Sequence, residues 1–392
     1  MKLLFATSLL PENEATSGYE IANRAILHGL RALGHEVVPI GYANPGKSAF
    51  VTAGSINLGD LSVTNADADT RQKLVWLKRA IQNGTSFAGS KLQIIKQDVF
   101  QSIIASEGHF DGVIINGAPM AAAFEKILTR TPFIYIAHNV EWKTAEQSAK
   151  SASNFFERTL FAREARMLKA LEQRMAAKAK HVFTLADDDS AAFKQMGAKS
   201  VSAIPLIVGL NPQLPTARAP KWDAGLIGTW SWAPNRVGLD WFLNDVTPHL
   251  PNEFTVAIAG KLPGNPQIKH RGVRLLGRVE SALEFTRNCA CVPLVSRAGT
   301  GVQLKTLEAF ELGLPSVATS SSVRGLTNIP NNCVIQDDPK LFADALVMAA
   351  QKGKSADLDG SVFHNTQKAL MLSALKNGVG VFEPQSFLQA AE

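Results

Sequence analysis

Residues 299–319 read GTGVQLKTLEAFELGLPSVAT, and this stretch decides how the rest of the chain is interpreted. Two glycines flank Thr300, a helical pattern follows and stops at Gly313, and Pro315 opens an apolar run typical of a buried strand. A loop of small residues ahead of a helix leaves backbone N–H groups free at the positive end of the helix dipole. This arrangement predicts a binding site for phosphate.

Lys305 and Glu308 lie three residues apart on the predicted helix, so their side chains share nearly the same face. Lys305 falls in the first helical turns, where its charge adds to the positive end of the dipole. From these residues alone two interpretations stay open. Both side chains take part in an anion site, or Lys305 faces outward and pairs with Glu308 or Glu311 on the surface.

Length and composition limit the class of protein. A chain of 392 residues is too long for one ordinary core, which predicts two domains. A hydrophobic content of 46% and a charged content of 19% are typical of a soluble globular enzyme and argue against disorder. The formal net charge of +6 suits an anionic ligand or an anionic surface.

Cysteine usage and the N-terminus indicate a cytoplasmic protein. Three cysteines, Cys289, Cys291 and Cys333, give neither a disulfide framework nor a zinc pattern, and a reducing compartment is expected. The opening MKLLFATSLL is expected to be a first β-strand rather than a signal peptide, because the run is short and PENEATSG follows it. The sequence has no apolar run of about 18 residues, so we expect no membrane span.

Short apolar runs alternate with helical patterns along the chain. KLLFATSLL is followed by a predicted glycine turn at Gly18, a helix that ends at Gly34, and the strand HEVVPIGY. The runs are continuous, as expected for strands that are covered on both faces, and they predict a parallel sheet between helix layers. The further strands expected in this half are GVIING, PFIYIAH, HVFTLA and SVSAIPL.

A polar, proline-rich stretch, GLNPQLPTARAPKW, then reads as a linker. A second α/β series follows it, with the expected strands DAGLIG, EFTVAIAG, GVRLLG, CACVPLV, PSVATS and CVIQ. We therefore expect two doubly wound domains, residues 1–207 and 208–375, with residues from about 376 to 392 packing back on the first. In open parallel sheets ligands bind beyond the carboxyl ends of the strands, which predicts a site in a cleft between the domains.

Common nucleotide and metal motifs are absent from the sequence. No G-x-G-x-x-G follows the first strand, which disfavours a nicotinamide dehydrogenase, and neither a P-loop, an H-E-x-x-H nor a G-x-S-x-G occurs. Two D-x-D matches, Asp67 with Asp69 and Asp187 with Asp189, lie at predicted helix starts. Carboxylates there cap free N–H groups and oppose the dipole. We interpret both pairs as caps and expect no metal.

The stretch VPLVSRAGTGVQLKTLEAFELGLPSVAT resembles the donor-site segment of retaining glycosyltransferases of the GT-B fold, in their large family 4, the glycosyl transferases group 1. Members of that family usually carry two glutamates eight positions apart. The second matches Glu308, which by resemblance holds the ribose hydroxyls of a nucleotide. The first falls on Thr300, whose hydroxyl, with the backbone of Gly301 and Val302, would meet the transferred sugar.

GLIGTWSWAPNRVGLDWF resembles the first strand and helix of the nucleotide-binding domain. The usual members neutralise the diphosphate with an arginine and a lysine in this region, whereas this chain has Thr229 and Asn235 at about those positions. The positive charge must therefore come from elsewhere. Lys305 is the first candidate, Lys261 in AGKLPG the second and Arg236 the third.

Three more segments fit the same family. LLGRVESALEFTRNCACVPLV places Gly277 and Arg278 near the base-binding edge. LPENEATSGYE resembles the glycine loop after the first strand, where Gly18 allows close approach to the donor phosphates. IAHNVEW resembles a segment in which a strand-end histidine, here His138, lines the cleft. Its implied role is to orient or deprotonate the acceptor, or to bond the donor sugar.

The resemblance thus implies a GT-B fold with two Rossmann-like domains that face each other across a cleft. It implies transfer of a sugar from a nucleotide-diphospho-sugar to a hydroxyl of a saccharide or lipid-linked saccharide, with retention of configuration and without a metal or other cofactor. Such an activity suits bacterial polysaccharide or glycolipid assembly. A nucleotide-sugar epimerase of the same fold and a non-catalytic nucleotide-binding protein stay open as alternatives. The expected catalytic residues are His138, Lys305 and Glu308.

Basic residues gather between residues 143 and 180, and a second basic stretch with a tryptophan covers Trp76–Arg79. One interpretation is a solvated helical face with ion pairs three or four residues apart. The other is a surface that meets an anionic lipid or an anionic acceptor. On the second interpretation the protein would lie on the inner face of the cell membrane. Nucleic acid is not an expected partner.

Overall fold

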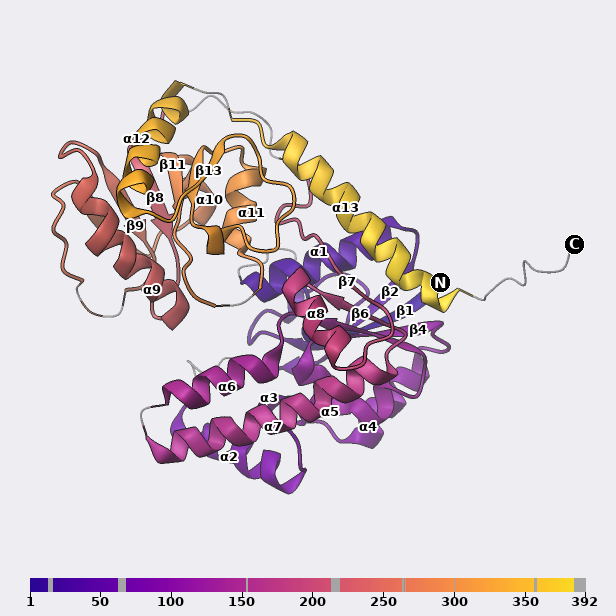
Figure 1. Cartoon of the computed structure of the whole chain (residues 1–392). Coiled ribbons are helices and arrows are strands. Elements are labelled where there is room, and N and C mark those ends of the chain that lie inside the picture. Colours follow the sequence, from indigo (N-terminus) through magenta and orange to yellow (C-terminus); the bar gives the residue numbers. More distant parts are fainter. Residues whose placement is uncertain are drawn as a thin grey trace, which may run out of the picture. The chain divides into compact units, whose positions relative to one another are not determined.

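The computed structural model describes residues 1–12, 17–62, 68–152, 154–212, 219–262, 264, 266–299, 301–355 and 358–383. The chain forms two compact units (Figure 1). Unit 1 comprises Met1–Pro205 with Leu370–Glu392, and unit 2 comprises Leu206–Ala369.

The core of unit 1 is a parallel sheet with the strand order β3-β2-β1-β4-β5-β6-β7 among the described residues. Its strands are β1 (Lys2–Leu9), β2 (Glu36–Ala43), β3 (Ile56–Asp60), β4 (Gly112–Asn116), β5 (Phe133–Ala137), β6 (His181–Thr184) and β7 (Val201–Ala203). Because the chain returns from the edge strand β3 to β4 on the far side of β1, the order reverses between β1 and β4. This is the point of a doubly wound sheet at which ligands bind.

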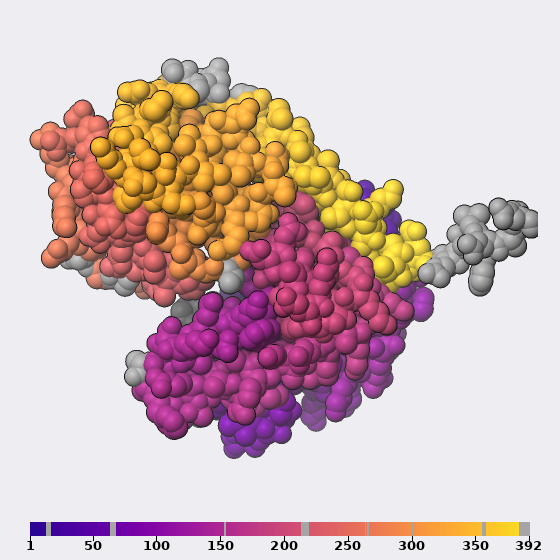
Figure 2. Space-filling view, viewed as in Figure 1, coloured from indigo at the N-terminus to yellow at the C-terminus, as the bar shows by residue number. Residues whose placement is uncertain are grey.

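The helices of unit 1 are α1 (Gly18–Ala32), α2 (Thr70–Gln82), α3 (Phe87–Leu92), α4 (Gln97–Ser106), α5 (Ala118–Leu128), α6 (Glu141–Ser151), α7 (Phe155–Lys178) and α8 (Asp187–Gln195), with the 3₁₀ turn Ser48–Phe50. Ser17 and Glu20 close a capping box at the start of α1. Gly34 follows the end of α1 with a φ of +86°, which only glycine adopts without strain. Helices α6 and α7 run side by side (Figure 1) and contribute to the surface seen in Figure 2.

The core of unit 2 is a second parallel sheet, with the order β10-β9-β8-β11-β12-β13 among the residues described. Its strands are β8 (Trp222–Ile227), β9 (Val256–Ala259), β10 (Val273–Gly277), β11 (Cys289–Leu294), β12 (Ser316–Ala318) and β13 (Cys333–Ile335). Its helices are α9 (Ala233–Trp241), α10 (Ala282–Arg287), α11 (Leu304–Glu311) and α12 (Pro339–Ser355), with the short helical turns Phe242–Val246, Thr247–His249 and Ser320–Ser322. The order reverses again between β8 and β11, and the candidate site lies there.

The last helix, α13 (Ser361–Val379), contributes residues 361–369 to unit 2 and its remainder to unit 1, before the 3₁₀ turn Gly380–Phe382. The second half of α13 packs closely in unit 1, since a Cβ atom added at Gly29 would lie 2.6 Å from Leu375 Cδ1. Among the described residues, none of the helices combines the length and apolar composition of a membrane span.

Candidate active site

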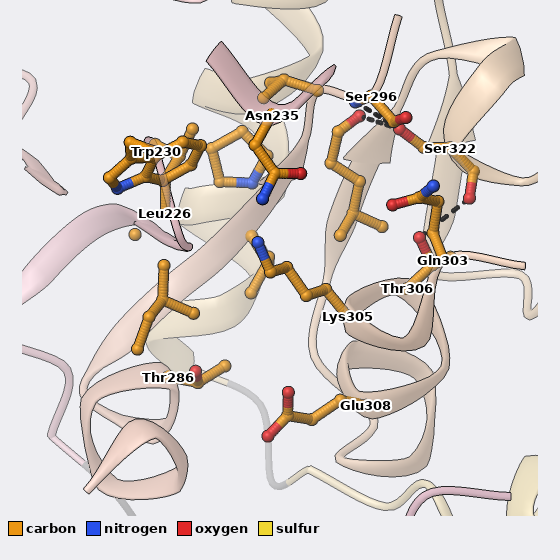
Figure 3. A pocket seen from close by; sticks show the side chains of 16 residues that line it. Leu226, Trp230, Asn235, Thr286, Ser296, Gln303, Lys305, Thr306, Glu308 and Ser322 are labelled. Carbon is orange, nitrogen blue, oxygen red and sulfur yellow. Dashed lines mark hydrogen bonds between the residues drawn. The ribbon is translucent and has the colours of Figure 1, made fainter. Parts of the chain in front are cut away.

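A small pocket lies in unit 2 between the end of β8, the start of α9 and the start of α11 (Figure 3). Its volume is about 60 Å³. The side chains of Trp230, Asn235, Lys305 and Glu308 line it, and Ser296 and Ser322 close its other side. The pocket therefore lies at the reversal between β8 and β11, where a doubly wound sheet binds ligands.

The loop before α11 is shaped by glycine. Gly299 and Gly301 adopt φ values of +94° and +78°, in the left-handed region that favours glycine. Arg324 Nη2 donates to the carbonyl of Gly301 at 3.1 Å and holds the loop. The helix begins at Leu304, and its N-cap residue Gln303 makes no capping bond with its own side chain. The first turn of α11 thus offers N–H groups and a positive dipole end to an anion.

Lys305 points into the pocket rather than outward (Figure 3). Its Nζ lies 5.2 Å from the centre of the Trp230 ring, and a Cβ atom added at Gly228 would be 2.6 Å from Nζ. Burial lowers the pKa of Lys305 to about 8, although the nearby Glu308 raises it. The side chain is still mostly protonated at pH 7, so it brings a desolvated positive charge into the pocket.

Glu308 projects into the same pocket from the next turn of α11 (Figure 3). Burial raises the pKa of Glu308, the Lys305 charge lowers it, and Glu311 raises it further. No ion pair joins Lys305 to a carboxylate among the described residues, so the predicted alternative of a surface pair is wrong. Both charged groups are available to a ligand.

Glu311 has a different role at the far end of α11. It is buried, and its carboxylate accepts hydrogen bonds from the backbone N–H groups of Val208 and Gly209, each at 2.7 Å. His364 Nδ1 of α13 lies 3.4 Å from the same carboxylate. Glu311 thereby ties α11 to the segment that enters unit 2 and to the helix that leaves it.

The two uncharged residues predicted near the diphosphate are placed differently. Asn235, on α9, lines the pocket with Lys305, and its Nδ2 donates to the carbonyl of Thr229 at 3.1 Å. Thr229, in the turn between β8 and α9, is exposed. Of the described residues that line this pocket, Lys305 alone carries a full positive charge. Its position agrees with its rank as first candidate for binding the diphosphate.

The other candidate cations lie elsewhere in unit 2. Lys261 and Arg278 are exposed and line a separate pocket, of about 590 Å³, at the ends of β9 and β10. Gly277 contributes to the same pocket. Arg236 pairs with Asp240 across one turn of α9, its Nε 2.8 Å from the carboxylate, so its charge is neutralised. Neither Lys261 nor Arg236 lines the pocket of Lys305.

The structure describes part of the glycine loop that precedes α11. Gly301 is buried and Val302 half-buried, and the described lining of the pocket on this side begins at Gln303. Thr300, the residue predicted to meet the transferred sugar, lies outside the described residues. The backbone of this loop stays a predicted contact of the donor.

In unit 1, His138 lies directly after β5, at the carboxyl edge of the sheet. Its Nε2 is 2.9 Å from Asn116 Oδ1, at the end of β4, and its ring centre is 4.7 Å from that of Tyr19. Asn116 Nδ2 already donates to Thr7 Oγ1 and Asn23 Oδ1, so Oδ1 is the acceptor that remains for His138. His138 therefore donates through Nε2 and keeps a lone pair on Nδ1.

Burial lowers the pKa of His138 to about 4, so the ring is neutral at pH 7. A base with so low a pKa is weak near neutrality, whereas it accepts a hydrogen bond from a hydroxyl readily. Of the roles that the resemblance implies, orientation of a hydroxyl fits this environment best. The sequence reasoning missed Asn116, Tyr19 and Asn23. Asn116 could have been identified from the sequence, because it is the polar residue before the final glycine of the run GVIING, at the strand's carboxyl end.

Two other sequence predictions need correction. Gly18 forms no turn, because it is the exposed first residue of α1 and its φ is not positive. Trp76 is not a surface residue, since only 3% of it is exposed and it packs edge-on against Phe87 at 5.9 Å. Lys91 Nζ lies 5.0 Å from the Trp76 ring and Arg79 donates to the carbonyl of Ser90 at 3.0 Å, so this stretch serves packing.

The two D-x-D matches differ in their relation to a helix N-cap. Asp69 is the N-cap of α2 and accepts from the N–H of Gln72 at 2.7 Å, so its prediction as a cap is confirmed, while Asp67 lies outside the described residues. Asp187 and Asp189 stand in the first turn of α8, but the N-cap there is Ala186. Asp187 is exposed and Asp189 is buried. In the described part of the chain no group of three or more histidine, cysteine, aspartate or glutamate residues could hold a metal ion.

Comparison with protein families agrees with this geometry. Residues 223–352 match the family described as Glycosyl transferases group 1, which confirms the resemblance over this part of the chain. No curated protein sequence matches the chain significantly.

Solved structures resemble the chain over nearly its whole length. WaaG, a glycosyltransferase involved in lipopolysaccharide biosynthesis, has a TM-score of 0.57 at 15% identity, covering 96% of this chain and 100% of its own. Anabaena HepE in complex with UDP and glucose has 0.55 at 14%, covering 97% and 98%. S. aureus TarM, as a mutant with fondaparinux, α-GlcNAc-glycerol and UDP, has 0.59 at 11%, covering 98% and 100%. The predicted fold class, two doubly wound α/β domains of GT-B type, is confirmed.

Proposed function

We propose that the chain is a glycosyltransferase that moves a sugar from a nucleotide-diphospho-sugar to a hydroxyl, with retention of configuration and without a metal. One observation carries the proposal. Lys305 and Glu308 project from successive turns of α11 into one pocket, behind a loop that two left-handed glycines shape. The match of residues 223–352 to the glycosyl transferases group 1 supports it.

On this proposal the diphosphate lies at the start of α11, where first-turn N–H groups and Lys305 meet its charge. Charge grows on the terminal phosphate as the bond to the sugar breaks. A fixed cation in a water-poor pocket therefore stabilises the transition state more than the bound donor. Glu308 accepts the hydrogen bonds of the ribose hydroxyls, which a carboxylate does strongly.

We assign the acceptor to unit 1, where neutral His138 accepts, through Nδ1, a hydrogen bond from a hydroxyl next to the one that attacks, and so orients the acceptor. As the resemblance implies, the hydroxyl attacks the face from which the phosphate departs. The new bond joins the acceptor oxygen to the anomeric carbon, the bond to the phosphate breaks, and the hydroxyl proton passes to the departing phosphate oxygen. Retention follows without a covalent intermediate on the protein.

The acceptor we propose is a saccharide or a lipid-linked saccharide, and the setting bacterial polysaccharide or glycolipid assembly. The role of WaaG in lipopolysaccharide biosynthesis and the presence of α-GlcNAc-glycerol and UDP in the TarM complex support this choice. We place the protein in the cytoplasm, in peripheral contact with an anionic membrane through unit 1.

The test is a donor screen with purified protein over UDP-, GDP- and ADP-sugars, in EDTA and in its absence. We expect one donor to be bound and slowly hydrolysed to free sugar and nucleoside diphosphate, with EDTA making no difference. Activity lost in EDTA and restored by Mg²⁺ or Mn²⁺ contradicts metal independence. Tight binding of a nucleotide with no turnover contradicts the enzyme and indicates a binding protein.

A further inference from the structure

A basic groove runs between α6 and α7 in unit 1, with a volume of about 680 Å³. We call it the α6–α7 groove, and its described lining is Trp142, Glu146, Ala149, Lys150, Arg158, Ala162, Ala165, Arg166 and Lys169. Four cations face one carboxylate there, so the lining carries a net charge of +3. None of these residues belongs to the candidate active site.

The charges of the groove are mostly free of partners. Lys150 pairs with Glu146 across one turn of α6, with Nζ 3.6 Å from the carboxylate. Among the described residues no ion pair is formed by Arg158, Arg166 or Lys169, and all three are exposed. An anion in the groove would therefore replace water around these cations rather than break existing ion pairs.

The groove also has an apolar surface. Lys169 Nζ lies 4.7 Å from the centre of the Trp142 ring, which fixes a cation over an aromatic face. Alanines from both helices line the rest, so neighbouring side chains leave room for a ligand. From Trp142 to Lys150 is eight residues of helix, which spans about 12 Å. That length suits one phosphate or diphosphate group and is short for a track of nucleic acid.

Two phenylalanines stand one turn from the basic end of the groove. Phe155 and Phe156 begin α7, three and two residues before Arg158, and are 82% and 64% exposed. Two adjacent exposed aromatic side chains form an apolar patch, and an apolar patch bordered by polar residues is typical of an interaction site. Next to unpaired arginines, the partner that satisfies both features is an amphiphile with an anionic head and a hydrocarbon chain.

We propose that the α6–α7 groove binds the phosphate group of a lipid-phosphate acceptor, with Phe155 and Phe156 entering the hydrocarbon layer. This deepens the proposed function, on which it rests, by naming the substrate class as a saccharide carried on a lipid phosphate. Along the chain the groove begins at Trp142, four residues after His138, so one segment presents both the carrier site and the hydroxyl-orienting histidine.

The experiment measures flotation of the full chain with phosphatidylcholine vesicles that contain polyprenyl phosphate, or phosphatidylglycerol at equal charge. We expect tighter binding to the polyprenyl phosphate vesicles. The pair Arg158→Glu with Arg166→Glu should weaken it at least about 25-fold, since each of the two basic residues near an anionic surface contributes about fivefold. Lys180→Glu with Lys199→Glu, exposed loop lysines outside the groove, makes the same charge change and should cost less than threefold.

Phe155→Ser with Phe156→Ser separates a lipid from a free anion. It should abolish flotation without changing the calorimetric binding of inorganic pyrophosphate, whereas the arginine variant should lose both. The pyrophosphate measurements use a Lys305→Ala background, so that the pocket of α11 does not account for the binding. Circular dichroism and thermal unfolding check the fold of every variant. Equal losses in the groove and control variants, equal binding to both anionic vesicles, or pyrophosphate binding unaffected by Arg158→Glu with Arg166→Glu would each overturn the proposal. Because no nucleotide-sugar is present, these outcomes do not depend on whether the chain transfers sugar.

Discussion

The pocket of α11 and the α6–α7 groove both offer positive charge to an anion, yet they do so in opposite physical settings. The pocket has one lysine, so desolvated that its pKa falls to about 8, in a space of about 60 Å³. The groove has four cations, largely exposed, in a space of about 680 Å³. A single charge in a poorly hydrated pocket acts strongly on one atom, whereas several hydrated charges attract a class of anions weakly and at longer range. The difference separates a site for chemistry from a site for anchoring.

The largest effect is expected for Lys305→Ala, which removes the full positive charge from the pocket of α11. We expect kcat to fall about 10²- to 10³-fold and KM to rise less, because the lost charge acts mainly on the departing phosphate. Steady-state kinetics with the donor from the screen measure both. Turnover within twofold of the wild-type value would remove Lys305 from the mechanism and leave Lys261 as the next candidate.

Glu308→Ala tests the second group of the same pocket. A hydrogen bond to a charged group contributes about 1.5–3 kcal/mol, so kcat/KM for the donor should fall roughly 10- to 100-fold. Calorimetry with the free nucleoside diphosphate should show a similar loss of affinity. A folded variant that binds the nucleotide as tightly as wild type contradicts the ribose contact.

The pH dependence of the reaction should distinguish buried Lys305 from an exposed lysine. The pKa of Lys305 is lowered to about 8, so its protonated form prevails below that pH and is lost above it. We expect kcat/KM for the donor, which reports the free enzyme, to fall about tenfold for each pH unit above 8. A pH–rate profile that stays flat to pH 10 would mean that an ordinary exposed lysine, or none, is involved.

Gly228→Ala tests whether the position of Lys305 Nζ matters, without removing a charge. The added Cβ atom would lie 2.6 Å from Lys305 Nζ, so the flexible end of the lysine must move away from the end of β8. We expect kcat to fall about tenfold, because a displaced catalytic group loses part of its effect. Gly380→Ala is the matched control, since an added Cβ there meets no atom within 4 Å. Equal kinetics for the two variants would show that the position of Nζ is unimportant.

The smallest expected effect is that of salt on the donor site. Between about 0.1 and 0.5 M NaCl, KM for the donor should change less than about threefold, because a partly buried charge is poorly screened. Flotation with anionic vesicles should fall steeply over the same range. A donor KM that rises as steeply as the vesicle affinity falls would erase the difference between the two regions.

Much of the fold follows from local pattern. Continuous apolar runs predicted the strands of both sheets except β3, whose INLGD alternates polar and apolar residues at an exposed edge. Trp76 was wrongly predicted to lie on a basic surface. A helical stretch with basic residues and one aromatic residue has the same sequence pattern whether the ring is buried or exposed. The side chains that converge around His138 come from β1, α1 and β4, which only tertiary pairing brings together.

The candidate donor site was also predictable from the sequence only in part. Glycines ahead of a helix, with Lys305 and Glu308 one turn apart, are visible in sequence, and both residues line the pocket. Sequence could not decide that Lys305 turns inward, since that depends on the Trp230 ring and on the missing side chain at Gly228. It also could not separate Lys261 from the pocket, because both candidate loops follow strands of the same sheet.

Glu311 has a consequence for anyone who recombines this chain with a relative. The carboxylate that ends α11 holds Val208 and Gly209, and His364 on α13 approaches the same group. The donors at 208 and 209 are backbone N–H groups, so they depend on the path of the chain there. A hybrid protein joined after the linker, or before α13, changes that path or replaces His364, and a buried carboxylate that loses its donors costs several kcal/mol. The exchangeable cassette therefore extends from residue 206 through the first half of α13, and a crossover within it should yield insoluble protein.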